Sequence, residues 1–164
     1  MTLLRKLRIL SRESHGAALV ELTLLMPLLV TLMFGLAEFG QVLRQHHLME
    51  KGVRDAARFL THIDATPCPA DAAWTGAVSD AQNLAVFGRT TAREPLLDTW
   101  TDPASVVVEV ECIDNTAGTW RGGDVVAVVT VTASALYADL GLLGFFGFEP
   151  PTLNVSHQQL VVGG

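Results

Sequence analysis

The sequence predicts an α+β fold, in which a long N-terminal helix carries a small head with an antiparallel sheet. Residues 17–37 form a 21-residue apolar run whose only charge is Glu21. Apolar residues then recur every three or four positions to about Thr61, which is typical of an amphipathic helix. Three valine-rich segments in the last third of the chain alternate apolar and polar residues, as strands with one buried face do.

The apolar run at residues 17–37 is long enough to cross a membrane, because a spanning helix needs about 20 residues. Four basic residues and one acidic residue precede it and give residues 1–16 a net charge of +3: Arg5, Lys6, Arg8, Arg12 and Glu13. The whole chain carries −6, so the remainder carries −9. The positive-inside rule then keeps the N-terminus in the cytoplasm and sends residues 38–164 across the membrane. An acidic body without a basic patch argues against nucleic acid as a partner.

After the apolar run, residues 38–62 are predicted to continue the helix as an amphipathic extension. Its expected apolar face consists of Phe39, Val42, Leu43, His46, Met49, Val53, Ala56, Ala57 and Leu60. Gly40 and Gly52 should weaken this helix by about 1 kcal/mol each relative to alanine. Pro27 removes one backbone hydrogen bond from the apolar part, where we expect a kink.

The predicted head covers residues 63–164. Two prolines around Cys68 make residues 64–71 a loop, and residues 72–87 return to helical spacing before Gly88, a plausible C-terminal cap. Residues 89–104 are expected to connect this helix to the sheet. The predicted strands are residues 105–112, 124–135 and 152–162, the first two joined as a hairpin and the last two separated by an apolar loop.

Glu21 is the feature of the apolar run that most needs an explanation, because a charge within a membrane-spanning helix costs about 2.5–3.5 kcal/mol. Three interpretations compete. The run is a secretory signal cleaved after Ala37, or an uncleaved anchor in which Glu21 reaches the membrane interface. Alternatively, cleavage between Gly16 and Ala17 exposes an α-amine that neutralises Glu21.

The spacing in the third interpretation, glycine followed by four apolar residues and glutamate, resembles the type IV prepilin signal. The segment "GAALVELTLLMPLLVTLMFGLAEFGQVL" resembles the TadE-like pseudopilins of tight-adherence (Flp) pilus systems, with the family's usual residues at Gly16, Glu21, Pro27, Gly35, Glu38 and Gly40. "GVRDAARFLT" continues the resemblance, since Ala56-Ala57-Arg58 looks like the AAR signature. Leu22 departs from the aromatic residue of major Flp pilins, and the long body also favours a minor pilin.

The resemblance implies a pilin-like fold and a set of partners. A prepilin peptidase is expected to cleave after Gly16, and Glu21 to pair with the Ala17 amine of a neighbouring subunit. The partners would be other pilins or pseudopilins and the inner-membrane assembly platform, in a pilus that serves surface adherence. The protein would cross the bacterial inner membrane once, with a periplasmic head, and enter the pilus. The alternative is a periplasmic scaffold or binding protein, uncleaved or cleaved after Ala37.

Cys68 and Cys112 are the two cysteines of the chain, and neither belongs to a CxxC motif. In an exported head we expect a disulfide between them, which ties the loop after the long helix to the first strand. Closing this loop adds about 4 kcal/mol to stability in the chain-entropy model. The alternative is two buried thiols in a reduced protein.

No catalytic motif and no cofactor site is recognised in the sequence, so we expect a non-enzymatic protein. His46 and His47 are adjacent, and neighbouring helical residues point in different directions, so a metal site is not predicted there. Glu109 and Glu111 are expected on a solvated strand face. Phe145 and Phe146, in the apolar loop, are a possible interface, or they cover the sheet.

Overall fold

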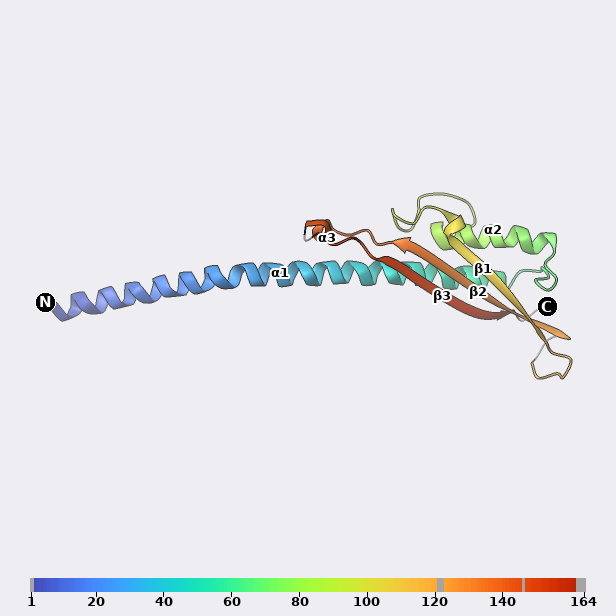
Figure 1. Ribbon diagram of the computed structural model, residues 1–164, viewed down its shortest axis with the longest axis horizontal. Coiled ribbons are helices and arrows are strands. Elements are labelled where there is room, and N and C mark those ends of the chain that lie inside the picture. Colours follow the sequence, from blue (N-terminus) through green and yellow to red (C-terminus); the bar gives the residue numbers. More distant parts are fainter. Residues whose placement is uncertain (1, 121–122, 146, 162–164) are drawn as a thin grey trace. The chain divides into compact units, whose positions relative to one another are not determined.

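The computed structural model describes residues 2–120, 123–145 and 147–161, with the backbone alone for residues 2–15 and 145. It confirms the α+β fold (Figure 1). The helices are α1 (Thr2–Leu60), α2 (Ala72–Phe87), the 3-10 turn η1 (Pro103–Ser105) and α3 (Leu142–Phe145). The strands are β1 (Val106–Asp114), β2 (Val125–Leu136) and β3 (Thr152–Val161).

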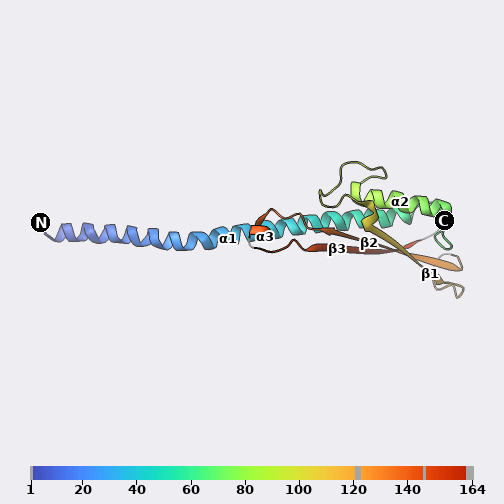
Figure 2. The ribbon, with the colours of Figure 1, turned by 45° about the horizontal axis from the view of Figure 1, so that its top comes forward.

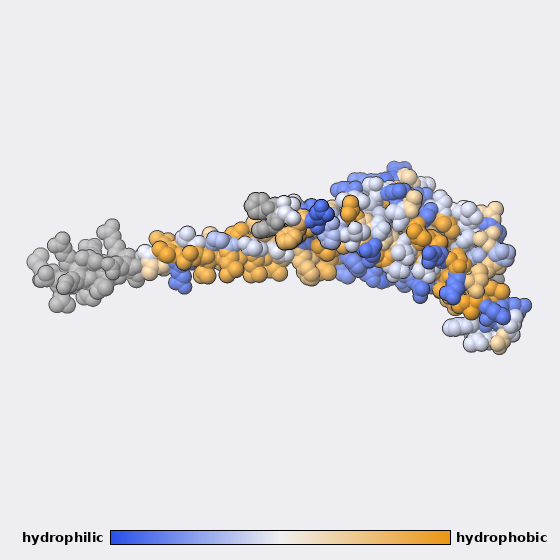
Figure 3. Space-filling model, viewed as in Figure 1, coloured by the Kyte–Doolittle hydropathy of each residue, from blue (hydrophilic) through white to orange (hydrophobic). Residues whose placement is uncertain are grey.

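The chain divides into two compact units, Met1–Gly40 and Gln41–Gly164. The described part of the first unit is helical throughout and belongs to α1. Its side chains from residue 16 to residue 37 are all exposed, and hydrophobic surface runs along it (Figure 3). The apolar side chains of this helical segment are therefore not covered by any other part of the first unit that the structure describes.

The helix α1 continues through Pro27 without a break. Two threonines in this part turn their hydroxyls back onto the helix: Thr23 Oγ1 donates to the Leu19 carbonyl at 2.7 Å and Thr31 Oγ1 to the Pro27 carbonyl at 2.8 Å. Such bonds satisfy hydroxyl groups within the segment, as an apolar environment requires.

In the second unit, one face of α1 enters the hydrophobic core, as its periodicity predicted. Met49, Val53, Ala56, Ala57 and Leu60 are at most 1% exposed. The prediction fails at Phe39 and Leu43, which are exposed, and at Gln45, which is buried. The two alanines of the Ala56-Ala57-Arg58 motif therefore pack inside the head, while Arg58 faces solvent.

The helix α2 has a cap at each end. Before its first turn, the Asp71 carboxylate accepts the Trp74 amide at 2.6 Å and the Thr66 amide at 3.1 Å. The Trp74 and Thr66 amides lower the pKa of Asp71 from its ordinary value of 3.8, since they stabilise the charged form. At the other end Gly88 adopts the left-handed conformation with φ of 68° and donates to the Leu84 carbonyl.

A close contact joins α1 to α2 at Gly52. A Cβ atom added to Gly52 would collide with the carbonyl oxygen of Ala85 and lie 3.3 Å from the Trp100 ring. Trp100 is 1% exposed and donates from Nε1 to Ser105 Oγ at 2.9 Å. Only glycine fits here without displacing backbone, so the residue that weakens α1 locally is required by the packing of the head.

The three strands form an antiparallel sheet in the order β1-β2-β3, and two views show them side by side (Figures 1 and 2). The predicted hairpin is β1 and β2, with Val108 opposite Val131 and Val110 opposite Val129. These valines face the core, whereas Glu109 and Glu111 are exposed, as predicted. The sheet therefore has one buried face and one face toward water.

Asn115 shapes the start of the β1–β2 connection. Its side chain is 4% exposed and donates to the carbonyls of Trp120 and Gly123, each at 2.9 Å, while accepting the Trp120 amide at 2.9 Å. One buried amide therefore satisfies three backbone groups of the turn.

The segment between β2 and β3 is fastened to α1 by Gln45. The Gln45 side chain donates to the Ala138 carbonyl at 2.7 Å and accepts the Ala138 amide at 3.0 Å, as a neighbouring strand would. The Tyr137 amide donates to the Pro151 carbonyl at 3.0 Å and closes the base of the segment. The sequence predicted an irregular loop here, and the structure adds the single turn α3 within it.

Candidate functional site

The candidate functional site is the N-terminal part of α1 around Glu21. Within the described residues, the helical segment Gly16–Leu60 contains an 18-residue window with a mean hydropathy of 2.1, none of it buried. By length and composition this segment can cross a membrane once. Glu21 is exposed on it, and it is the only charged side chain between residues 17 and 37.

Gly16 and Ala17 lie one turn before Glu21, inside the continuous helix α1. A Cβ atom added at Gly16 would meet nothing within 4 Å, so packing does not explain a glycine at this position. Glycine has, however, the lowest helix propensity of all residues except proline, about 1 kcal/mol less favourable than alanine. Local unwinding at the Gly16–Ala17 bond therefore costs less than at the leucine and alanine positions of the apolar segment.

The basic side chains before Gly16 lie outside the part of the chain whose side chains the structure describes. Their expected role in orientation rests on the sequence alone.

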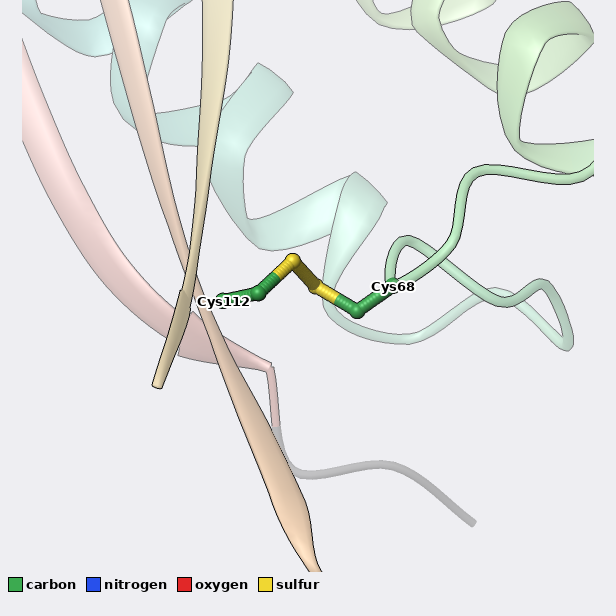
Figure 4. Close-up of a disulfide and its surroundings, with 2 residues drawn as sticks. All are labelled: Cys68 and Cys112. Carbon is green, nitrogen blue, oxygen red and sulfur yellow. A yellow bond between two sulfur atoms is a disulfide. The ribbon is translucent and has the colours of Figure 1, made fainter. Parts of the chain in front are cut away.

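Cys68 and Cys112 form a disulfide, with their Cα atoms 6.0 Å apart (Figure 4). This confirms the predicted pair and excludes two buried free thiols. Cys68 lies in the segment between α1 and α2, and Cys112 lies on β1, which continues to Asp114 rather than ending at the cysteine. The bond therefore links the chain just beyond the long helix to an edge strand of the sheet.

The possible interface at Phe145 and Phe146 is only partly visible. Phe146 lies outside the described residues, and for Phe145 only the backbone, at the end of α3, is described. Two other apolar residues of the same loop are exposed, Leu140 at 56% and Phe148 at 66%. The choice between interface and sheet cover remains a prediction.

At His46 and His47, where the sequence predicted no metal site, the ring centroids lie 6.2 Å apart. Glu50 lies about one turn further along α1, and its position around the helix axis falls between those of His46 and His47. One ligand atom from each of the three residues lies within 4.8 Å of the others. The sequence reasoning compared only the two histidines with each other. The spacing of four residues from His46 to Glu50 was the signal that could have found the third member.

Comparison with known proteins gives one match. No curated protein and no solved structure matches the chain. A family model described as TadE-like protein matches residues 16–58, which contain Gly16, Glu21 and the Ala56-Ala57-Arg58 motif. The matched segment covers the apolar part of α1 and most of its amphipathic continuation. Through this segment the chain is similar to the TadE-like proteins, and the match covers no other part of the chain.

Proposed function

We propose that the chain is a minor pilin of a Tad-type pilus, made with a basic leader that a prepilin peptidase removes after Gly16. The mature protein begins at Ala17 and has a structural role in the assembly of a pilus for surface adherence, with no catalytic activity of its own. The observation that carries this proposal is Glu21, a lone charge exposed on an apolar helix five residues after Gly16. The family match, which begins at residue 16, supports it.

The physical argument concerns the partner of Glu21. An isolated carboxylate within a membrane-spanning helix costs about 2.5–3.5 kcal/mol, and a nearby opposite charge removes much of that cost. Residues 17–37 contain no basic side chain. Cleavage between Gly16 and Ala17 creates an α-amine in the same membrane layer as Glu21. When two such helices pack side by side, the amine of one subunit neutralises the glutamate of its neighbour.

Two independent features support the same orientation across the membrane. The net charge of +3 before the apolar segment favours a cytoplasmic N-terminus. The disulfide between Cys68 and Cys112 is typical of an oxidising compartment, such as the periplasm. Both are satisfied by a protein that crosses the inner membrane once and has a periplasmic head.

The partners that follow are defined by this chemistry. The prepilin peptidase acts on the Gly16–Ala17 bond near the cytoplasmic face. Other pilins or pseudopilins of the same system offer apolar helices with a matching amine and carboxylate, and the inner-membrane assembly platform would receive the processed subunit. The exposed apolar surface of residues 17–37 is the part available to such helices.

The experiment replaces Glu21 with alanine in cells that assemble the pilus. We expect E21A to reach the membrane at the wild-type level, since the change makes the segment more apolar, but to be missing from pili and their assembly complexes. The matched control is E13A, because Glu13 is also a carboxylate but lies in the leader, which the proposed cleavage removes before assembly. Wild-type amounts of E21A in sheared pili and in isolated assembly complexes would refute the proposed role of Glu21.

A further inference from the structure

We propose that His46, His47 and Glu50 form a binding site for one divalent transition-metal ion, with Zn²⁺ as the best-suited ion, on the exposed face of α1. The inference rests on one turn of helix in the second unit. It does not depend on cleavage at Gly16 or on the proposed function.

The first argument is geometric. Ligand atoms about 2.1 Å from a tetrahedral zinc ion are about 3.4 Å apart. The Nδ1 atom of His47 and the Oε2 atom of Glu50 are already 3.5 Å apart. The ligand atom of His46 completes a group whose members all lie within 4.8 Å of one another, close to the spacing that the ion requires.

The second argument concerns the rigidity of the supporting helix. Two residues of the same helical stretch anchor α1 in the head: Gln45, directly before the cluster, is 2% exposed and holds Ala138 through two hydrogen bonds, and Met49, directly before Glu50, is fully buried. The three candidate ligands therefore project from a helical turn whose other side is fixed. A site on a rigid element loses less conformational entropy when it binds an ion than a site on a loop.

The third argument is the chemistry of the donors. Two neutral imidazoles and one carboxylate suit zinc and its transition-metal neighbours, whereas Mg²⁺ and Ca²⁺ prefer oxygen ligands. His47 is 72% exposed, which leaves the remaining coordination position open to water or to a donor from another molecule. Arg54 Nη2 lies 3.4 Å from Glu50 Oε1 and thus contacts the oxygen that the ion does not need. This contact would orient the carboxylate toward the histidines.

The test measures Zn²⁺ binding to the full chain, purified in detergent without a polyhistidine tag, by competition with a chromophoric chelator. We expect one ion per chain, at least a tenfold loss of affinity in each of H46A, H47A and E50Q, and no change in H62A. The tenfold threshold is the lower end of the loss seen when even an indirect partner of a metal ligand is removed. His62 is the matched control, since it is also exposed but lies outside the cluster.

A second measurement separates binding from folding. Co²⁺ in place of Zn²⁺ should give the visible absorption of a low-symmetry site in the wild-type chain, and this absorption should be absent from H47A. Because His47 is largely exposed, H47A should unfold at the wild-type temperature. Equal affinity in the wild-type chain and in all three cluster variants would overturn the proposal, as would binding of Mg²⁺ at the same concentration as Zn²⁺.

Discussion

Replacing Gly52 with alanine tests the packing of the head most sharply, because the added methyl group has two opposite effects on the free energy of unfolding: better helix propensity raises it and steric collision lowers it. Alanine favours an isolated helix over glycine by about 1 kcal/mol. In this structure, however, the new Cβ atom would collide with the Ala85 carbonyl oxygen and press on the Trp100 ring at 3.3 Å. Overpacking of this kind typically costs about 1–3 kcal/mol, and the neighbour here is helix backbone, which cannot rotate away.

We expect the collision to dominate, so that G52A lowers the free energy of unfolding by about 1–2 kcal/mol despite its better helix propensity. The matched control is G76A in α2, where an added Cβ atom meets nothing within 4 Å. That variant should raise the free energy of unfolding by about 0.5–1 kcal/mol. Urea denaturation of the two full-length variants in detergent, followed by circular dichroism, measures both signs. A G52A variant as stable as the wild type would refute the close contact between α1 and α2.

Three further predictions concern the head. Replacing Cys68 and Cys112 together with serine should lower the free energy of unfolding by about 4 kcal/mol in the chain-entropy model, measured by urea denaturation; a reductant should destabilise the wild type but not the variant. D71A should lower the unfolding temperature at neutral pH and reduce the loss of stability at acidic pH. Because the pKa of Asp71 is lowered in the folded state, its stabilisation is present above the ordinary value of 3.8 and is lost as the pH falls through the folded value. An unfolding temperature that depends on pH in D71A as it does in the wild type would contradict this. Q45L should leave the Ala138 amide and carbonyl without their partner, at a cost of about 2–4 kcal/mol, and should speed hydrogen exchange at Ala138; unaltered exchange there would argue against the two bonds.

Much of the fold could be predicted because the controlling patterns are local. The boundaries of α2 followed from helical spacing ended by Gly88, and the β1–β2 hairpin followed from alternation of valines with polar residues. The disulfide required only the inference that the head is exported, which makes Cys68 and Cys112 natural partners.

The features that the sequence did not reveal depend on contacts between distant residues. Gly52 was interpreted as a weak point of the helix, because nothing local shows that Ala85 approaches it. Gln45 was missed because a polar residue next to an apolar stripe is usually exposed, and its partner is Ala138, 93 positions away. Asp71 could have been found, since an aspartate directly before a predicted helix is a common N-cap.

The same distinction between local patterns and contacts applies to the candidate sites. The sequence was enough to select Gly16, Ala17 and Glu21, because the prediction there depends on the spacing of residues along one helix. The four-residue spacing from His46 to Glu50 could have suggested a cluster with His47, but only the side-chain positions show that the three ligand atoms lie within 4.8 Å of one another.

The mass of the mature N-terminal peptide, obtained from protein purified from its native membranes, tests the central claim most directly. Cleavage after Gly16 predicts a chain that begins at Ala17, with Glu21 as its fifth residue. A chain that still begins at Met1, or one that begins at Glu38, would contradict the account, because no α-amine would then lie beside Glu21 in the membrane.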